Sequence, residues 1–333
     1  MRKDWLILGG VTSVALLIAV SPFLPKHAPI VVGPDALADE KDNAISVLLV
    51  GDIMLDRGIA THAREVGDKK LFEGVQALLK GHDAVIGNLE GTITSNPSVS
   101  QLDNSVMRFT FAPKYAEVLA QLGLSALSLA NNHALDFGEF GYDDTRHFLD
   151  IAGVSTFGSP FNDAHLAVLK SVKDKNLCVV GYHSLFKPDP ASVLTKIKVI
   201  REECDYIIIF AHWGEEYQHE PTSKQREFAH AFVDAGADVV VGAHPHVVEP
   251  LEIYNNHAIF YSLGNFLFDQ GWRPEVKRGV ALAVEFSASS TKFTLTPVDT
   301  YREVSVAGTS TSQAVLSDLG VATPEPFFLN LIY

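Results

Sequence analysis

The sequence has little cysteine and little positive charge, and each shortage excludes a class of protein. Only two of the 333 residues are cysteines, so the chain is not a disulfide scaffold. Cys178 and Cys204 could form one bridge, but each adjoins an apolar run, which favours two buried thiols. Lysine and arginine total 26 against 40 acidic residues, a net charge of -14. This balance argues against nucleic acid as a partner and is compatible with gathering divalent cations.

Long uncharged apolar stretches are also scarce, and the one that stands out lies at the N-terminus. Residues 5–25 contain no charge, and as a helix they would extend roughly 30 Å, the hydrocarbon thickness of a bilayer. Arg2 and Lys3 precede the stretch, so the positive-inside rule places the N-terminus in the cytoplasm. Signal-peptidase cleavage at Ala36-Leu37-Ala38 is the alternative, but this site lies about a dozen residues beyond the end of the apolar stretch, which is far for such a site. We expect a single-pass anchor in the cell membrane (residues 1–25), a linker (26–43) and a main domain on the extracytoplasmic side.

From residue 44 onward, apolar runs typical of buried strands alternate with helical stretches. The runs are residues 45–50, 83–87, 124–129, 205–210 and 237–241, and the expected helices include 71–80, 113–122, 142–152 and 223–235. This alternation indicates βαβ units and a largely parallel sheet. Beyond residue 250 short apolar runs are separated by turn residues without helices, which predicts antiparallel strands. We assign residues 44–300 to one domain and 301–333 to a tail packed on it.

Polar side chains follow these apolar runs, and the carboxyl ends of parallel strands meet at one edge of a sheet. His244 and His246 follow the last run; in an extended segment residues two apart point to the same side, so both imidazoles can face one point. Taken alone, two close histidines in a chain with 13 are typical of a loop. The other apolar runs are also followed by polar side chains, which add candidate ligands to this pair. The candidate metal ligands at this edge are Asp52, Glu90 or Asn88, Asn132, His212, His244 and His246.

These candidates combine imidazole, carboxylate and amide groups and include no cysteine. Such a set suits one or two Mn²⁺, Fe or Zn²⁺ ions better than Ca²⁺ or a structural zinc. A divalent metal there would polarise a phosphoryl or carbonyl group and lower the pKa of bound water. Glu216 is a candidate general acid or base, with a solvated glutamate as the equal alternative. Arg57 is a candidate for holding an anionic substrate group, although a surface ion pair is the commoner role.

Six motifs occur in order between about residues 45 and 286. They are Gly51-Asp52-Ile53-Met54, Gly87-Asn88-Leu89-Glu90-Gly91, Ala130-Asn131-Asn132-His133, His212-Trp213-Gly214, Gly242-Ala243-His244-Pro245-His246 and Tyr261-Ser262-Leu263-Gly264-Asn265-Phe266. Together they resemble the CapA family of poly-gamma-glutamate capsule biosynthesis proteins. That family is similar in fold to the calcineurin-like metallophosphoesterases. The resemblance therefore implies an α/β fold, a four-layer α-β-β-α sandwich, with the antiparallel strands of the last third in the second sheet.

The resemblance also implies roles for single residues. His133 matches the histidine that assists the leaving group, and Asn265 and Asp136 would hold substrate or orient ligands. The positions that match metal ligands of the phosphoesterases are Asp52, Asn132, His212, His244 and His246.

Two positions depart from the phosphoesterase pattern. Met54 stands where those enzymes have a histidine, and thioether sulfur is a poor ligand for hard metals. Asn88 and Glu90 stand where they have a bridging aspartate. These departures favour one metal, or a second one in a shifted position, over a complete dinuclear centre.

Two functions are consistent with these features. The first is a membrane-anchored protein of capsule biosynthesis, with a metal-dependent hydrolase or transferase site acting on an anionic polymer or its precursor. The second is a non-catalytic polymer-binding or export partner of a capsule synthase complex. Both predict other membrane proteins of that complex as partners, and no nucleic acid. A third alternative is that the resemblance reports the fold only.

Overall fold

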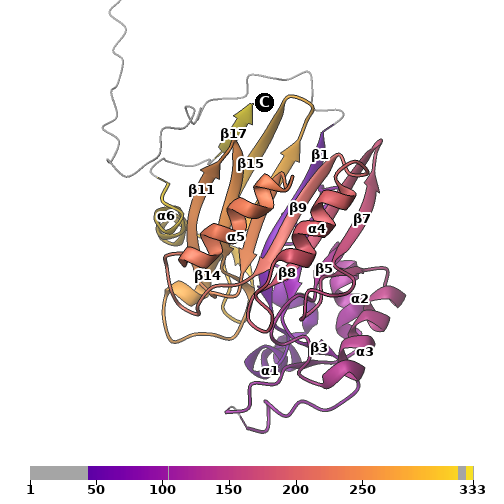
Figure 1. Cartoon of the computed structure of the whole chain (residues 1–333). Coiled ribbons are helices and arrows are strands. Elements are labelled where there is room, and N and C mark those ends of the chain that lie inside the picture. The colour runs from indigo at the N-terminus through magenta and orange to yellow at the C-terminus, as the bar shows by residue number, and fades with distance from the viewer. Residues whose placement is uncertain (1–43, 104, 322–327, 333) are drawn as a thin grey trace, which may run out of the picture.

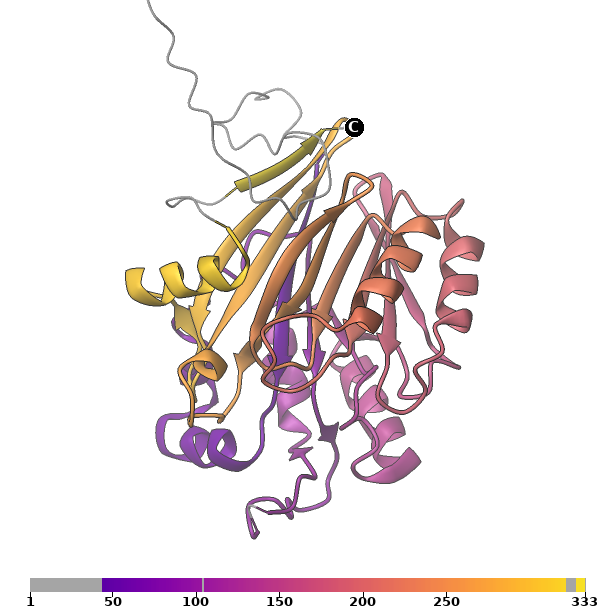
Figure 2. The same ribbon diagram turned by 60° about the vertical axis from the view of Figure 1, so that its left-hand side comes forward.

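The computed structural model describes residues 44–103, 105–321 and 328–332. The predicted anchor, residues 1–25, and the predicted linker, residues 26–43, lie outside these ranges. Among the described residues, no helix combines the length and apolarity needed to cross a bilayer. The described chain forms two large β-sheets that lie face to face, with helices on their outer sides (Figure 1 and Figure 2).

The first sheet is built around the strand that opens the domain. Its strands are β1 (Ile45–Ile53), β2 (Ala84–Leu89), β5 (Ala126–Ser128), β6 (Ser155–Phe157), β13 (Asn265–Leu267), β14 (Arg278–Phe286), β15 (Ser290–Asp299), β16 (Ser305–Val306) and β17 (Phe328–Ile332). Their order is β16-β15-β14-β1-β2-β5-β6, with β13 on β1 and β17 on β15. The strands β1, β2, β5 and β6 are parallel, whereas β14 and β15 are antiparallel to their neighbours.

The second sheet has six strands in the order β11-β12-β10-β9-β8-β7. They are β7 (Ala167–Val172), β8 (Lys175–His183), β9 (Tyr206–His212), β10 (Val239–Ala243), β11 (Val248–Tyr254) and β12 (His257–Leu263). The four central strands are parallel, and only β7 and β11 at the edges are antiparallel. A separate two-stranded pair consists of β3 (Thr92–Ile93) and β4 (Thr110–Phe111).

Helices cover the outer face of each sheet. The first sheet carries α1 (Arg57–Val66), the 3₁₀ helix η1 (Asp68–Phe72), α2 (Lys114–Gln121) and α3 (Gly138–Ile151); the second carries α4 (Ala191–Ile200) and α5 (Ser223–Asp234). The remaining helical elements are η2 (Glu275–Lys277) and α6 (Thr309–Asp318).

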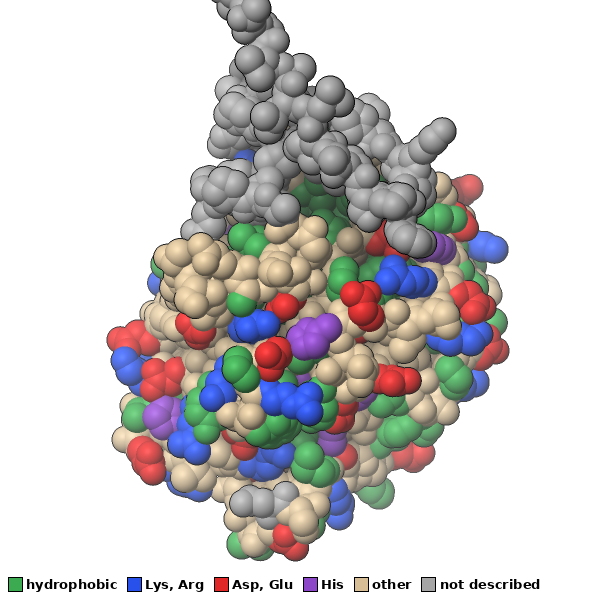
Figure 3. All heavy atoms as spheres, turned by 90° about the vertical axis from the view of Figure 1, so that its left-hand side faces the viewer, with side chains coloured by type: hydrophobic (Ala, Val, Ile, Leu, Met, Phe, Trp, Pro, Cys, Tyr) green, Lys and Arg blue, Asp and Glu red, His purple; other side chains and the backbone are tan. Residues whose placement is uncertain are grey.

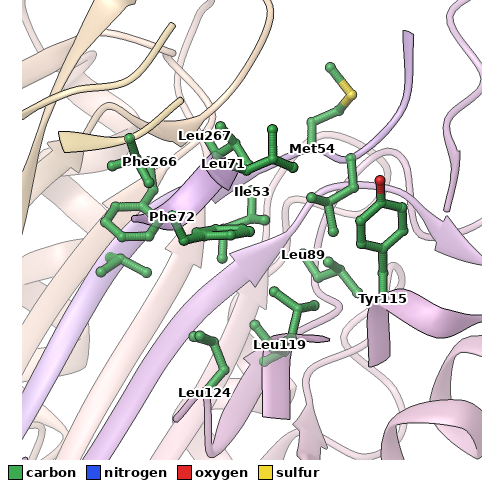
Figure 4. Close-up of a cluster of buried hydrophobic side chains, with 14 of the residues drawn as sticks. Ile53, Met54, Leu71, Phe72, Leu89, Tyr115, Leu119, Leu124, Phe266 and Leu267 are labelled. Carbon is green, nitrogen blue, oxygen red and sulfur yellow. The ribbon is translucent and has the colours of Figure 1, made fainter. Parts of the chain in front are cut away.

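Three apolar cores separate the layers, as the alternation along β1 shows. Leu48 and Val50 face the helices in the outer core drawn in Figure 4, whereas Val47 and Leu49 face the second sheet. A third core joins β8, β9, β10 and β12 to α4 and α5. Since side chains alternate between the faces of a strand, β1 can be apolar throughout and belong to two cores. The predicted four-layer α-β-β-α sandwich is therefore the arrangement observed.

The strands of the last third divide between both sheets, so their predicted placement in the second sheet is confirmed for β11 and β12 and wrong for β14 and β15. β14 lies antiparallel to β1 in the first sheet, with Leu49 opposite Leu282, and β15 follows it. β11 and β12 belong to the second sheet, and β12 is parallel to β10. Apolar faces on β14 and β15 fill the space between the sheets, which is why these strands extend the first sheet.

The helix expected at residues 71–80 is also misplaced. The chain instead forms α1 directly after β1, where the Asp56 side chain accepts a hydrogen bond from the Arg57 backbone. It then makes the short η1 and continues in turns. A Cβ at Gly74 would come within 2.5 Å of the Ser305 side chain, so close contact with β16 holds this segment in an irregular path.

The two cysteines form a disulfide, so the prediction of two buried thiols is wrong. Cys178 lies on β8, and Cys204 lies in the turn between α4 and β9. β8 and β9 are parallel neighbours with Cys178 opposite Ile207, and the return from α4 brings Cys204 to a Cα–Cα distance of 5.9 Å. That separation lies in the usual range for a disulfide.

Candidate metal centre

The predicted ligands come from both sheets and meet at one end of the sandwich. Asp52 ends β1, and His212 ends β9 in the opposite sheet. A Cβ at Gly51 would lie 1.8 Å from the Gly264 carbonyl oxygen, and one at Gly242 would lie 1.8 Å from that of Tyr261. Glycine is required at both positions because the neighbouring backbone passes directly beside each strand end.

His244 and His246 converge by a turn and not by the extended segment expected from the sequence. β10 ends at Ala243, and His244 and His246 have φ values of 96° and 57°. Positive φ is uncommon outside glycine, and such strain is typical of functional sites. Both rings are nevertheless buried near the same point, with centroids 5.9 Å apart.

The carboxyl groups of Asp52 and Glu90 lie between the histidines. His246 Nδ1 is 3.4 Å from Asp52 Oδ2, and His212 Nδ1 is 3.9 Å from Asp52 Oδ1. His246 Nε2 is 3.7 Å from Glu90 Oε1. Two sets of three buried groups have ligand atoms close enough to share an ion, namely Glu90 with His244 and His246, and Asp52 with Glu90 and His212.

Asn88 and Glu90 differ in their hydrogen bonds. The Asn88 amide donates to Asp52 at 2.7 Å, and its oxygen accepts from Asn131 at 3.0 Å. Neither oxygen of the fully buried Glu90 has a hydrogen-bond partner. Burial and the neighbouring Asp52 raise the pKa of Glu90 well above its ordinary value. Glu90 therefore has free ligand atoms that a cation would satisfy, whereas Asn88 orients Asp52.

Asn132 and His244 complete the side of the centre nearest the second sheet. Asn132 Oδ1 is 2.7 Å from His212 Nε2, and the His212 and His244 ring centroids are 4.7 Å apart. His244 Nδ1 is buried without a partner. Burial, and then the neighbouring histidines, lower the pKa of His212 well below the ordinary value and that of His244 to about 3. Both rings are thus neutral near pH 7, the form in which imidazole binds metal.

His246 differs because it faces both carboxyl groups. Burial alone would lower its pKa, but Glu90 and Asp52 outweigh burial and raise the pKa of His246 to about 9. Asn265 lies behind the ring, with its Oδ1 3.0 Å from His246 Nδ1. The Asn265 amide nitrogen donates to Gln270 and to the Val276 carbonyl. This fully buried side chain orients His246, and the predicted contact of Asn265 with substrate does not fit its position.

His133, the predicted catalytic histidine, lies at the edge of the same cluster. Its Nδ1 is 2.8 Å from Asp136 Oδ2, and its Nε2 is 3.9 Å from Glu90 Oε1. The ring stacks on Phe109 at a centroid distance of 4.2 Å. Because Asp136 accepts a hydrogen bond from Nδ1–H, the proton of a neutral His133 stays on Nδ1, and Nε2 is free to accept a proton beside the centre.

Arg57 and Glu216 lie at the periphery. Arg57 pairs with Asp269, and its guanidinium lies 4.8 Å from the centre of the Phe109 ring. It lines a pocket of about 500 Å³ that also includes Trp272 and Arg302. Glu216 is exposed, and its charge contributes to raising the pKa of both Glu90 and His246, which places it within electrostatic reach of the centre.

Met54 does not face the centre. It is fully buried in the outer core of the first sheet (Figure 4), and its sulfur accepts a hydrogen bond from the Asp56 backbone. The residue that was expected to depart from the phosphoesterase pattern is thus part of the apolar core.

The sequence analysis did not single out one buried histidine that lies beside this cluster. His183 ends β8, directly opposite His212 in the β8–β9 register. The sequence pattern that could have indicated His183 is the one that indicated the predicted ligands, namely a polar residue after an apolar run, here residues 177–180.

The residues present fit a divalent cation. Both Glu90 oxygens and His244 Nδ1 are buried without partners, and unpaired buried groups are costly unless something satisfies them. The donors are carboxylate, amide and imidazole groups, as borderline metals prefer.

Comparison with known proteins decides the family. The model of a family described as "Bacterial capsule synthesis protein PGA_cap" matches residues 46–270, about two thirds of the chain. The chain belongs to this bacterial capsule synthesis family. It is 32% identical over 279 residues to the PGA biosynthesis protein CapA of Bacillus subtilis, covering 78% of this chain and 72% of that protein. The capsule biosynthesis protein CapA of Bacillus anthracis is 32% identical over 257 residues, covering 70% and 62%.

Solved structures similar to this capsule synthesis family member are distant. A hypothetical protein from Thermus thermophilus has a TM-score of 0.46 at 15% identity, covering 87% of this chain and 99% of that one. A 5'-nucleotidase from Candida albicans has a TM-score of 0.41 at 10% identity, covering 85% and 55%. At these values neither likeness supports a conclusion about chemistry.

Proposed function

We propose that this protein is a metal-dependent hydrolase or transferase of capsule polymer synthesis. The observation that carries the proposal is the group of buried ligand atoms without partners, Glu90 Oε1 and Oε2 with His244 Nδ1. The proposed ligands are Asp52, Glu90, Asn132, His212, His244 and His246. A bound divalent cation would supply Lewis-acid polarisation of a phosphoryl or carbonyl oxygen and lower the pKa of a bound water.

His133 is the proton-transfer residue of this proposal. Asp136 holds the ring in one tautomer, and stacking on Phe109 fixes its plane. The Nε2 atom then faces Glu90 and the centre, where it can exchange a proton with an attacking or leaving oxygen or nitrogen.

The substrate proposed is an anionic polymer of glutamate or its phosphorylated precursor. The name of the Bacillus subtilis relative refers to PGA biosynthesis. Arg57 and Arg302 line the pocket of about 500 Å³ next to Phe109, and Trp272 adds an exposed aromatic face. On the face drawn in Figure 3, acidic and basic side chains are interspersed and neither sign forms a broad area. That face has no broad positive area, so we assign binding of the anionic chain to this pocket, where Glu65 and Asp269 offset part of the arginine charge.

The location proposed is the outer side of the cell membrane, with residues 1–25 as the anchor. The uncharged stretch 5–25 preceded by Arg2 and Lys3 supports it. The Cys178–Cys204 disulfide also supports it, because disulfides persist in oxidising compartments outside the cytoplasm. Other membrane proteins of a capsule synthesis complex are the proposed partners.

The test is metal analysis of the purified full-length chain beside a His244→Ala/His246→Ala variant. Both proteins are then assayed with generic phosphodiesters and with gamma-glutamyl amides, after addition of Mn²⁺, Fe²⁺ or Zn²⁺. We expect bound metal and hydrolysis in the wild type only. A wild type that binds no metal and has no activity with any of them would contradict the proposal.

Met54 favours a second candidate function, a non-catalytic polymer-binding or export partner. Met54 stands where the resemblance implies a ligand, and its burial in the apolar core supports a centre that lacks one ligand of a complete dinuclear site. In cells this alternative predicts that His244→Ala and Asn132→Ala leave polymer output intact, whereas deletion of residues 1–25 abolishes it.

A further inference from the structure

We infer that His183 is an additional ligand of the proposed cation. With His212 at the end of β9 and His244 directly after β10, it places an imidazole at the end of each of three neighbouring strands. The inference rests on the proposed function, because it requires a cation at the centre. Three features of His183 support it: its tautomer, its rigid backbone and its position beside His212.

The hydrogen bonds of His183 leave one nitrogen free. The ring is fully buried, and its Nδ1 lies 2.8 Å from the Pro160 carbonyl oxygen. A carbonyl only accepts, so Nδ1 carries the proton and Nε2 presents a lone pair. That Nε2 atom is buried without a partner. A histidine whose other ring nitrogen donates to a carbonyl is the usual arrangement for a metal ligand.

The backbone of His183 is held from both sides by Asn162. The Asn162 oxygen accepts from the His183 backbone nitrogen at 2.9 Å, and the Asn162 amide donates to the His183 carbonyl at 2.7 Å. Asn162 is itself buried and adopts a φ of 54°. A polar loop thus fixes one histidine by three hydrogen bonds, which is more than apolar packing requires and is typical of a preorganised ligand.

The β8–β9 register places the ring beside the centre. His183 lies opposite His212, and partners on neighbouring strands project to the same face of a sheet. The ring centroids of His183 and His212 are 5.8 Å apart, and those of His212 and His244 are 4.7 Å apart. With a metal–nitrogen bond of about 2.1 Å, two imidazoles on one ion have centroids roughly 4.5–6 Å apart. Both centroid distances lie within this range. His183 is outside the two groups of three carboxylate and imidazole residues whose ligand atoms already lie close enough to share an ion, so the inference includes a small shift of its ring toward the centre on binding.

An additional imidazole changes the metal that the centre prefers. Imidazole suits Zn²⁺, Fe and Cu better than Mg²⁺ or Mn²⁺, which prefer oxygen ligands. With His183, the strand ends of the second sheet contribute four nitrogen ligands, namely His183, His212, His244 and His246, so we expect this protein to select Zn²⁺ over Mn²⁺.

The test compares His183→Asn, His183→Gln and a control, His230→Asn, in the full-length protein. Asparagine can keep the donor to the Pro160 carbonyl while removing the ligand atom at the Nε2 position, whereas glutamine returns a polar group there. His230 lies on α5 and contacts Tyr254 and Glu252, not the centre. Zn²⁺ and Mn²⁺ affinities are measured by competition with a chromophoric chelator, and the visible spectrum is recorded with Co²⁺.

We expect His183→Asn to lower Zn²⁺ affinity at least about tenfold, to reduce the preference for Zn²⁺ over Mn²⁺ and to alter the Co²⁺ spectrum. His183→Gln should lose less Zn²⁺ affinity than His183→Asn. His230→Asn should match the wild type in metal affinity and in the Co²⁺ spectrum. Wild-type affinity and an unchanged Co²⁺ spectrum in His183→Asn would overturn the inference and leave the proposed function standing. A wild type that binds none of the three metals would overturn both.

Discussion

Replacement of Glu90 by glutamine should change stability in opposite directions with and without metal. In the absence of a cation, Glu90 is a fully buried carboxyl group that lacks a hydrogen-bond partner and lies beside Asp52. Glutamine keeps the shape of the side chain and removes the charge. We therefore expect Glu90→Gln to be more stable than the wild type in a chelator and to gain less from added metal.

The structure sets the size of both effects. Glutamine leaves a neutral amide that is equally buried, so the expected gain of Glu90→Gln in EDTA comes only from removing the buried charge and its repulsion by Asp52, and is on the order of 1 kcal/mol. A cation at 100 times its Kd stabilises the wild type by about 2.7 kcal/mol. If Glu90→Gln weakens binding about 100-fold, the upper range for residues that only support a ligand, the same metal concentration stabilises it by about 0.4 kcal/mol. The difference of about 2.3 kcal/mol corresponds to roughly 3–4 °C in Tm for a chain of this size.

The assay is thermal unfolding of wild type, Glu90→Gln and Glu249→Gln, each in EDTA and in Zn²⁺ or Mn²⁺. Glu249 is a matched control, because it is also fully buried with an unpartnered Oε1 but lies on β11 and donates nothing to the centre. Glu249→Gln should keep the full metal-induced gain of the wild type.

Two results would refute this reasoning. Equal metal-induced stabilisation of wild type and Glu90→Gln would show that Glu90 is not a ligand. A Glu90→Gln protein less stable than the wild type in EDTA would show that the carboxyl group has a favourable partner after all.

Four further predictions follow from the same contacts. His133→Gln should lower kcat about 10²–10⁴-fold with bound metal unchanged; loss of metal on analysis would contradict the proton-transfer role. Asn265→Ala should weaken metal binding about 10–100-fold in chelator competition, because His246 loses the amide that orients it; unchanged affinity would count against this role. Burial raises the pKa of Glu249 to about 8 from 4.5, so between these values the folded state holds a proton that the unfolded state has lost, and stability falls as the pH rises through this window. Urea unfolding of the wild type should show a free energy of unfolding that is lower at about pH 8.5 than at about pH 5, by on the order of 3 kcal/mol. Glu249→Gln should lack this loss, and the exposed-site control Glu227→Gln should keep it. The same pH dependence in the wild type and in Glu249→Gln would refute the prediction. Gly242→Ala should destabilise the fold by about 3 kcal/mol, because its Cβ would lie 1.8 Å from the Tyr261 carbonyl oxygen. Gly308 has open space around it, so Gly308→Ala should have little effect in the same unfolding assay.

The motifs were sufficient to indicate the four layers, and the apolar runs to indicate most of the residues that meet at this end of the sandwich. Buried strands show as apolar runs, and a polar residue directly after such a run is visible without coordinates, as for Asp52 and His212. The order of the motifs was enough to indicate the capsule synthesis family and a four-layer sandwich. These features are local, because they depend on which residues follow one another along the chain.

Other features depend on residues far apart in the chain, and the sequence did not decide them. Apolar periodicity shows that β14 is a strand, but only the filling of the inter-sheet core places it beside β1. The two cysteines show the same limit, because 26 residues separate them and only the β8–β9 register brings them together.

The choice of ligands at the centre likewise belongs to the tertiary structure. From the sequence, Asn88 and Glu90 were equivalent candidates; in the fold the Asn88 amide is fully hydrogen-bonded, and Glu90 is left without partners. His244 and His246 converge through positive φ angles that an alternating strand pattern does not predict. Strand order along the chain thus determined which residues reach this end of the molecule, and the hydrogen bonds formed after folding decided which of their atoms remain free to bind a cation.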